Sequence, residues 1–483
     1  PPPLHPAPLH PLLSPPSSPS WPLVSLAACE LMSECTHPPG VCLFGTGEYT
    51  TGFAAGRAAT SDKSCGVAAL VMLDLRLRGR VSRIGMCGVN GPKLPAVREH
   101  MAAALGPFQG LDPRCIETWP EDDVVDQLAY RKAIESFSPG DVAIIFTPDH
   151  THADIATACF KRGMHVLITK PPTKTLNDHE LLVSEALKAK VLAAVEVHKR
   201  YDPIYIDARD RISRNLGPFS FFSSYMSQPK RQLETFRAWA GKNSDISYYL
   251  NSHHIDFHVW CLRGSSRPEL VTALYSDGVA NRLLEDREDH QNTEDTITLA
   301  VQWRNRSRCA PESSGSPGAT GLAPQVGESQ TAEHESPGPK RQRIASSSNP
   351  LPEPTTSFAG GSVGHATYTA SWIAPRSDVH SQQRWFYMGQ AGELSVDQAH
   401  RGYSGATDES GFGSINPLFW KPTRDAVTGR FNGQQCYGYR SFEAFVDACI
   451  ACNGGKASPR DFEDILPTLS TTLTTTAILE VCA

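Results

Sequence analysis

Between residues 41 and 197 the sequence alternates short apolar runs with longer stretches of helical pattern. The apolar runs predict strands at 41–44, 81–89, 115–118, 142–146, 165–168 and 191–197. The segments 64–78, 129–137, 152–162 and 177–188 lie between them and are long enough to cross from one parallel strand to the next. This alternation predicts an α/β fold with a doubly wound parallel sheet.

The alternation stops after Pro203, where strand-like runs appear at 219–226, 270–275, 296–303, 366–374 and 385–388. Strands that follow one another without helices between them predict an α+β domain with a mostly antiparallel sheet. Two C-terminal segments, 441–453 and 460–479, have helical pattern and are expected to pack on either domain.

Two segments lack the apolar residues that a folded core needs. Residues 1–40 are rich in Pro and Ser, and residues from about 305 to 363 are rich in Ser, Gly, Pro and Glu, so both are expected to be disordered. The first is expected to be a linker or a wrongly translated start rather than a transit peptide, which would carry arginines. Within the second, Lys340–Arg343 is either a nuclear address or a solvated charge cluster, and its shortness favours the cluster. We therefore predict a first, α/β domain at 41–200 and a second, α+β domain at 201–483 that is interrupted by the insertion at about 305–363.

Composition excludes several function classes. The formal net charge is −6, so the chain has no global positive field for nucleic acid or anionic membranes. No apolar run approaches the roughly 20 residues that span a bilayer. The 13 cysteines show no disulfide framework, which suits a reducing compartment and a cytoplasmic location. Cys449 and Cys452 form a C-x-x-C pair, but nothing nearby completes a zinc site.

The first predicted strand ends in a glycine-rich turn, Gly45-Thr46-Gly47-Glu48-Tyr49-Thr50. Such a turn lets backbone N–H groups approach a cofactor pyrophosphate at the start of the next helix. Thr50 occupies the position of the third glycine of the G-x-G-x-x-G pattern, and Gly52 follows two residues later. The turn nevertheless predicts a Rossmann cofactor site that includes Gly45, Thr46, Gly47, Glu48 and Tyr49.

The second predicted strand ends in Cys87-Gly88-Val89-Asn90, without the carboxylate that usually binds the ribose hydroxyls of NAD. Asn90, with Lys93, can instead receive a 2′-phosphate. The sequence therefore favours NADP over NAD as the cofactor, unless the strand ends at a different residue.

Two further strand ends carry the motifs Thr147-Pro148 with His152, and Lys170-Pro171. Their order and separation resemble the Gfo/Idh/MocA oxidoreductases, in which a strand ending in Thr-Pro is followed one helix later by a strand ending in Glu-Lys-Pro. The resemblance implies that Thr147, Pro148, His152 and Lys170 contact the cofactor and that Lys170 is catalytic. Thr169 replaces the family's glutamate.

The resemblance continues into the second domain. Arg200-Tyr201-Asp202-Pro203 is similar to the family's crossing between domains, and residues 389–397 to its late hairpin. The family's Asp-x-x-x-His-x-x-Asp pattern falls on Tyr249, His253 and Asp256. This implies that His253, with Tyr249 in place of the first aspartate, serves proton transfer, and that His198, Arg200 and Asp256 contact the substrate.

His254 and His258 are four residues apart, a spacing that can chelate zinc. The H-E-x-x-H pattern is absent because Ile255 follows His254, so we expect no metal site.

The sequence and the resemblance together predict hydride transfer between NAD(P) and a secondary alcohol or its ketone. The expected substrate is a sugar, polyol or inositol-like molecule, and the resemblance implies a homo-oligomer. The alternative is a non-catalytic dinucleotide sensor or interaction protein, favoured by Thr169 and Tyr249 at positions where the family has acids.

Overall fold

The structure, a computed structural model, describes most of the chain from residue 38 onward. The described residues are 38–54, 56–59, 63–237, 239–242, 244–285, 292–307, 342–343, 358–377, 379, 381–408 and 411–482. The predictions of disorder for residues 1–40 and about 305–363 fall mostly outside these ranges, as do two of the four residues of the basic run Lys340–Arg343.

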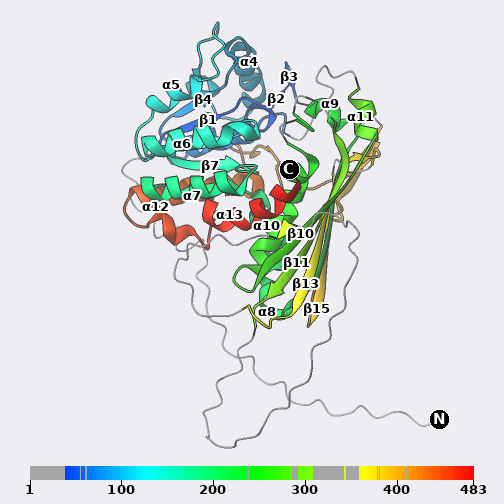
Figure 1. Ribbon diagram of the computed structural model, residues 1–483. Coiled ribbons are helices and arrows are strands. Elements are labelled where there is room, and N and C mark those ends of the chain that lie inside the picture. The colour runs from blue at the N-terminus through cyan, green and yellow to red at the C-terminus, as the bar shows by residue number, and fades with distance from the viewer. Residues whose placement is uncertain are drawn as a thin grey trace, which may run out of the picture. The chain divides into compact units, whose positions relative to one another are not determined.

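The N-terminal part contains a six-stranded, wholly parallel sheet in the order β5-β4-β1-β6-β7-β8 (Figure 1). The strands are β1 (Val41–Phe44), β4 (Ile84–Cys87), β5 (Ile116–Trp119), β6 (Val142–Ile145), β7 (His165–Thr169) and β8 (Ala193–Glu196). Each of the six has at least one end within two residues of the matching end of a predicted strand. The doubly wound parallel sheet is therefore confirmed.

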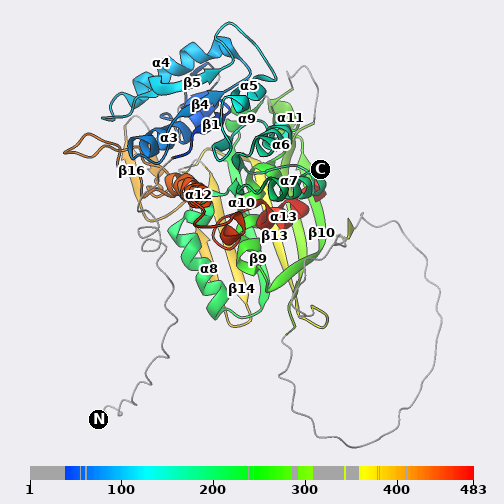
Figure 2. The same ribbon diagram turned by 90° about the vertical axis from the view of Figure 1, so that its left-hand side faces the viewer.

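Helices cover both faces of this sheet because its strands are apolar on both sides. In β1, Val41 and Leu43 face one hydrophobic cluster while Cys42 and Phe44 face another. The first cluster includes α3 (Ala68–Leu77), α4 (Leu94–Leu105) and the C-terminal α12 (Tyr437–Asn453); the second includes α5 (Ala129–Glu135), α6 (His152–Arg162) and α7 (Leu176–Ala189). Figure 2 shows α12 beside α3, where the Tyr439 hydroxyl donates to Asp74 Oδ2 at 2.6 Å.

The helix predicted over 64–78 is present as α3, but it begins at Ala68, and the segment between the glycine turn and this helix is irregular. A single helical turn, α2 (Glu48–Thr51), follows the glycines, and a small hairpin of β2 (Phe53–Ala54) and β3 (Arg57–Ala58) separates it from α3. Gly52 ends α2 in the left-handed conformation, with φ of 75°, which glycine adopts without strain.

The second sheet has seven strands in the order β12-β10-β11-β13-β9-β14-β15. They are β9 (Phe219–Pro229), β10 (Ser266–Asp277), β11 (Glu294–Asn305), β12 (Gln342–Arg343), β13 (Val363–Ala374), β14 (Gln382–Gly389) and β15 (Gly392–Asp397). Only the β13–β9 pair is parallel, so the mostly antiparallel sheet is confirmed. Helices α8 (Pro203–Asn215) and α10 (Ser252–Leu262) pack on one of its faces (Figure 2).

Shorter elements complete the described chain. They are α9 (Gln232–Phe236), α11 (Val279–Leu283), the hairpin β16 (Ser404–Thr407) and β17 (Gly411–Ser414), the π-helix η5 (Ser247–Asn251), and the 3-10 turns η1 (Gly91–Lys93), η2 (Pro113–Cys115), η3 (Asp149–Thr151), η4 (His198–Tyr201), η6 (Pro459–Phe462) and η7 (Glu480–Cys482).

The prediction of one helix over 460–479 is wrong. Only η6 and α13 (Leu469–Leu479) are helical, because Pro467 interrupts the segment. The Pro467 carbonyl accepts a hydrogen bond from Val195 N at 2.8 Å, and Thr468 forms a bridge with Ala194. The end of the chain therefore runs along the outer edge of β8 before α13 begins.

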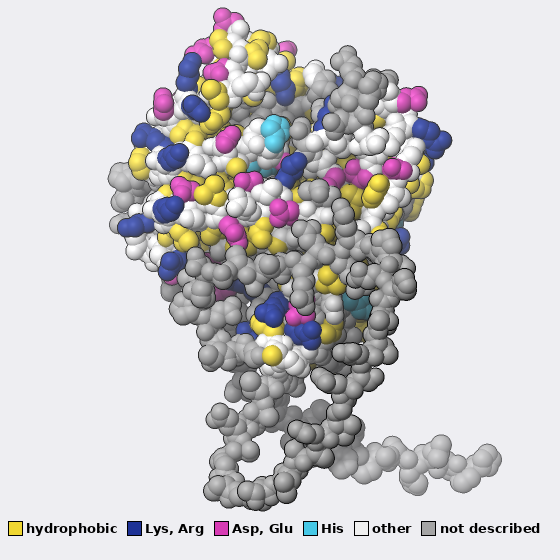
Figure 3. Space-filling model, viewed as in Figure 1, with side chains coloured by type: hydrophobic (Ala, Val, Ile, Leu, Met, Phe, Trp, Pro, Cys, Tyr) yellow, Lys and Arg dark blue, Asp and Glu magenta, His cyan; other side chains and the backbone are white. Residues whose placement is uncertain are grey.

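No helix among the described residues is long and apolar enough to cross a membrane. The nine cysteines that the structure describes are all free thiols. On the face shown in Figure 3, basic and acidic side chains are interspersed among the described residues.

Candidate active site

The glycine turn forms an open cradle at the carboxyl end of β1. Gly45 has a φ of 109°, and a Cβ there would stand 2.1 Å from the Phe146 carbonyl oxygen. A Cβ on Gly47 would meet no atom within 4 Å. Gly45 therefore serves close packing inside the protein, while Gly47 leaves the space that a diphosphate needs to approach the backbone. The residues present fit a dinucleotide cofactor.

Lys93 and Asn90, the two residues expected to receive a 2′-phosphate, have different surroundings. The Lys93 ammonium donates to the Thr46 carbonyl oxygen at 2.9 Å and lies 3.3 Å from Thr46 Oγ1, so it reinforces the glycine turn. Burial lowers the pKa of Lys93. Asn90 is exposed and its backbone bridges Val125 in the loop after β5.

The Tyr49 ring packs inside the protein. It stacks on Phe146 with centroids 4.8 Å apart and packs near Phe442, so its side chain belongs to the hydrophobic core behind the glycine turn. A cofactor contact at this residue would therefore be made by its backbone. The Glu48 carboxylate adds a smaller electrostatic contribution to the raised pKa of Tyr249.

His152 corrects the prediction of a cofactor contact. Its side chain is 0% exposed, and its ring nitrogens lie 3.0 Å from the Pro171 carbonyl oxygen and 2.8 Å from the Thr147 carbonyl oxygen. Thr151 Oγ1 donates to Thr147 Oγ1 at 2.7 Å and to the Pro148 carbonyl at 2.8 Å. His152 thus ties the Thr-Pro turn to the Lys-Pro turn and sets their relative position.

Replacing His152 by alanine should destabilise the protein by about 2–4 kcal/mol, because a buried carbonyl group loses its hydrogen-bond donor and the buried ring leaves a cavity between the two turns. Chemical denaturation of the variant measures this loss. His150→Ala, a change at an exposed histidine two residues earlier, is the control. Equal stability of His152→Ala and the wild type would show that the ring does not hold the two turns.

Lys170 stands at the carboxyl end of β7, at the same edge of the sheet as the glycine turn. Its ammonium donates a hydrogen bond to the Tyr249 carbonyl oxygen and lies 4.5 Å from the centre of the Tyr249 ring. Burial lowers the pKa of Lys170 to about 8, opposed by the negative charges of Asp149 and Glu196. A lysine that titrates near neutral pH is suited to polarising a substrate oxygen.

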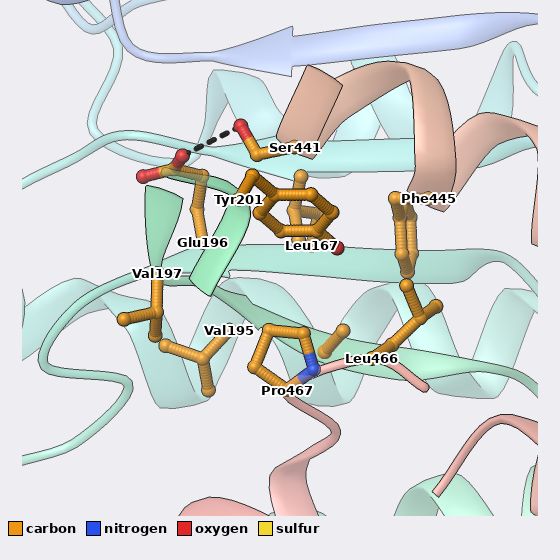
Figure 4. Close-up of a pocket in the computed structure, with 10 residues that line it drawn as sticks. Leu167, Val195, Glu196, Val197, Tyr201, Ser441, Phe445, Leu466 and Pro467 are labelled. Atoms are coloured by element: carbon orange, nitrogen blue, oxygen red, sulfur yellow. Dashed lines mark hydrogen bonds between the residues drawn. The ribbon is translucent and has the colours of Figure 1, made fainter. Parts of the chain in front are cut away.

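Glu196 supplies a carboxylate beside the position where the family glutamate is missing. Thr169 of β7 is paired in register with Glu196 of β8. Glu196 is 3% exposed, and its Oε1 accepts from Ser441 Oγ at 2.9 Å (Figure 4). Its Oε2 lies 3.2 Å from His198 Nδ1. The carboxylate that the family has at the position of Thr169 is therefore replaced by that of Glu196 on the neighbouring strand. Sequence reasoning missed Glu196 and Asp149, although a carboxylate ending a buried strand is itself a signal.

The two candidate histidines lie together beneath Lys170. The rings of His198 and His253 are 5.2 Å apart, and His253 is 8% exposed. His253 Nδ1 has no hydrogen-bond partner among the described residues. Burial, assisted by the charges of Lys170 and Lys199, lowers the pKa of His253 well below its usual value. The ring is therefore neutral, and the neighbouring positive charges oppose its protonation.

Lys199 is a second buried lysine that sequence reasoning missed. Its ammonium donates to Gln383 Oε1 at 2.6 Å and to Gln398 Oε1, and lies 5.0 Å from the Tyr205 ring centre. Burial lowers its pKa to about 7, opposed by Asp202. Its charge disfavours protonation of both His253 and its neighbour His254.

Tyr249 belongs to an aromatic cluster. Its ring stacks on Trp372 at 5.6 Å and lies 5.4 Å from Trp239 and 5.0 Å from Phe236. Burial raises the pKa of Tyr249, which makes the hydroxyl a still poorer base than a free tyrosine. The contact of Tyr249 with Lys170 is made by its backbone carbonyl and ring face.

Arg200 and Asp256, predicted to contact the substrate, bind each other. Arg200 Nε and Nη2 donate to the two Asp256 oxygens at 2.8 and 2.7 Å, and the two residues are 8% and 2% exposed. This buried bidentate pair joins η4 to α10 and positions His253 on the same helix. In the structure, both side chains therefore serve to join two elements of the fold. Their contact with a substrate stays a prediction.

His254 and His258 have separate partners. His254 Nε2 lies 3.0 Å from the Tyr205 hydroxyl, and His258 Nδ1 lies 2.6 Å from the Tyr368 hydroxyl. Among the residues that the structure describes, no group of three or more His, Cys, Asp or Glu side chains is arranged to hold a metal ion.

Comparison with known proteins identifies the region that carries these features. The model of an oxidoreductase family with an NAD-binding Rossmann fold, GFO_IDH_MocA, matches residues 117–197. This segment belongs to the Gfo/Idh/MocA oxidoreductase family. It includes both the Thr147-Pro148 and the Lys170-Pro171 turns, so the resemblance seen in the sequence is confirmed.

Two relatives from Bacillus subtilis match part of the chain. A scyllo-inositol 2-dehydrogenase (NADP(+)) is 28% identical over 190 residues, which are 38% of this chain and 50% of the relative. A scyllo-inositol 2-dehydrogenase (NAD(+)) is 30% identical over 123 residues, 25% of this chain and 31% of the relative. The chain therefore aligns with at most half the length of either relative.

Solved structures share the fold across both sheets. Myo-inositol 2-dehydrogenase from Lactobacillus plantarum superposes with a TM-score of 0.54 at 15% identity, covering 92% of this chain and 96% of that one. Scyllo-inositol dehydrogenase from Lactobacillus casei, with bound NAD(H) and scyllo-inositol, gives 0.52 at 10% identity, covering 91% and 94%. The two-sheet architecture is thus shared with these two solved dehydrogenase structures.

Proposed function

We propose that this protein transfers hydride between NAD or NADP and a secondary alcohol, or its ketone, of a sugar, polyol or inositol-like substrate. The observation that carries the proposal is the Lys170 ammonium, held by the Tyr249 carbonyl at the edge of the sheet where the glycine turn opens. Relatives named as inositol dehydrogenases support the substrate class.

The cofactor is expected to lie along the carboxyl edge of the parallel sheet. The backbone at Gly45, Thr46 and Gly47 would hold its diphosphate, and the turn at Thr147 and Pro148 would lie beneath its nicotinamide half. When bound, the nicotinamide accepts or returns the hydride.

The chain's own groups would orient the substrate and move its proton. The Lys170 ammonium would bind the reacting oxygen and polarise it. The neutral ring of His253 would take the hydroxyl proton as the alcohol is oxidised and return it in reduction. His198, held by Glu196, is placed to contact a neighbouring hydroxyl.

The alternative of a non-catalytic sensor rested on Thr169 and Tyr249. Glu196 and Asp149 place negative charge beside Lys170 despite the threonine, and His253 is present and neutral. These observations favour the catalytic proposal.

A panel of inositols, polyols and sugars tested with NAD and with NADP examines the proposal directly. We expect reduced nicotinamide to accumulate with at least one cyclic polyol or sugar. Tight cofactor binding without turnover on any member of the panel would favour the sensor instead.

The pKa of Lys170 predicts the pH dependence of this activity. The ammonium is the polarising form, and the protonated fraction falls as the pH rises through about 8. We therefore expect kcat/KM for alcohol oxidation to hold across neutral pH and to fall about tenfold per pH unit above that value. Steady-state rates across the pH range measure this. An activity that rises through pH 8 would show that the neutral amine, acting as a base, is the active form.

A further inference from the structure

The end of β4 lacks its own carboxylate, but a neighbouring loop reaches it. The loop between β5 and α5, residues 120–128, lies against residues 89–91. Gly91 N donates to the Val124 carbonyl at 2.8 Å, and Asp126 N donates to the Val89 carbonyl at 2.9 Å. A Cβ on Gly91 would stand 1.9 Å from the Glu121 carbonyl oxygen, so this close approach requires glycine.

The hydrogen bond from Asp126 N places residue 126 beside Val89, two residues after the end of β4. Asp126 Oδ1 accepts from Leu128 N at 2.8 Å, which fixes the orientation of the carboxylate. The residue is half-exposed. Burial, and after it the charge of Asp126, raises the pKa of the Cys87 thiol to about 12, in agreement with a carboxylate close to this strand end.

The nearby cations are already engaged. The Lys93 ammonium binds the Thr46 carbonyl, and Arg98 pairs with Asp122 and donates to Thr118 Oγ1 at 3.1 Å. In the structure, both cations therefore already have partners other than a ligand at the end of β4.

We infer that Asp126 determines cofactor choice by binding the adenosine ribose hydroxyls and repelling a 2′-phosphate, so that the protein prefers NAD to NADP. A carboxylate at the end of the second parallel strand usually has this role, and here a loop from the next strand supplies it. The inference rests on the proposed dinucleotide-binding function. It reverses the preference expected from Asn90 and Lys93.

Calorimetric titrations with NADH and NADPH test the inference without turnover. The wild type should bind NADH at least about tenfold more tightly than NADPH. Asp126→Asn keeps the hydrogen bond from Leu128 N but loses the charge, and should reduce this ratio about tenfold or more. Asp123→Asn, which removes the same charge from an exposed position of the loop, should change the ratio less than about threefold.

The outcomes separate the two proposals. Binding of both nucleotides with an equal or NADPH-favouring ratio in the wild type, or an unchanged ratio in Asp126→Asn, would overturn the role of Asp126 alone. Binding of neither nucleotide to the wild type would overturn the proposed function and this inference with it.

Discussion

Replacing Lys170 by methionine should lower kcat for polyol oxidation on the order of a thousandfold, as expected for the loss of a positioned proton-transfer and polarising group. Methionine keeps much of the side-chain volume while removing the ammonium that binds the Tyr249 carbonyl. Cofactor binding should be retained because the glycine turn is formed by other strands. Stopped assays with saturating cofactor and substrate measure the loss.

Lys161→Met is a matched control, since Lys161 is exposed on α6 and lies outside the site. It should retain wild-type rates. If Lys170→Met turned over at a rate within about tenfold of the wild type, the ammonium would not be part of the chemistry.

Alanine substitutions at Gly45 and at Gly47 should have different effects, the first on folding stability and the second on cofactor binding. Gly45→Ala places a Cβ 2.1 Å from the Phe146 carbonyl at a φ of 109°, so we expect a loss of about 2–5 kcal/mol in folding stability. Gly47→Ala meets no atom within 4 Å and should leave stability unchanged. It should instead weaken cofactor binding by on the order of tenfold or more, because its methyl group would stand where the diphosphate approaches.

Thermal melts of the two variants, without and with NAD, separate these effects. Ligand stabilisation of the wild type should exceed that of Gly47→Ala at equal cofactor concentration. A Gly47→Ala variant stabilised as strongly as the wild type would place the diphosphate elsewhere. A Gly45→Ala variant as stable as the wild type would contradict the packing of β1 against β6.

The parallel sheet could be predicted because its six strands are short apolar runs with helical segments between them. The hairpin of β2 and β3 could not, since residues 52–66 have neither the alternation of a strand nor the period of a helix. The break before α13 carried a signal in Pro467, whose ring and missing N–H end a helical pattern.

The motifs located the candidate site, but the partners of its residues came from tertiary contacts. Lys170 and His253 were found by their spacing within the motifs. Glu196 and Asp126 act from neighbouring strands and loops, at places that spacing along one element does not reveal. His152 was identified by its motif, yet its partners are backbone carbonyls that give no signal in the sequence.

Transfer of deuterium from carbon to the cofactor tests the central proposal most directly. The protein would be incubated with NAD and a cyclic polyol deuterated at its carbinol carbons, and the reduced nicotinamide analysed by mass spectrometry. We predict one deuterium in the nicotinamide ring with the wild type and none above background with Lys170→Met. Wild-type protein that binds NAD but transfers no deuterium from any inositol, polyol or sugar of the panel would contradict hydride transfer as its function.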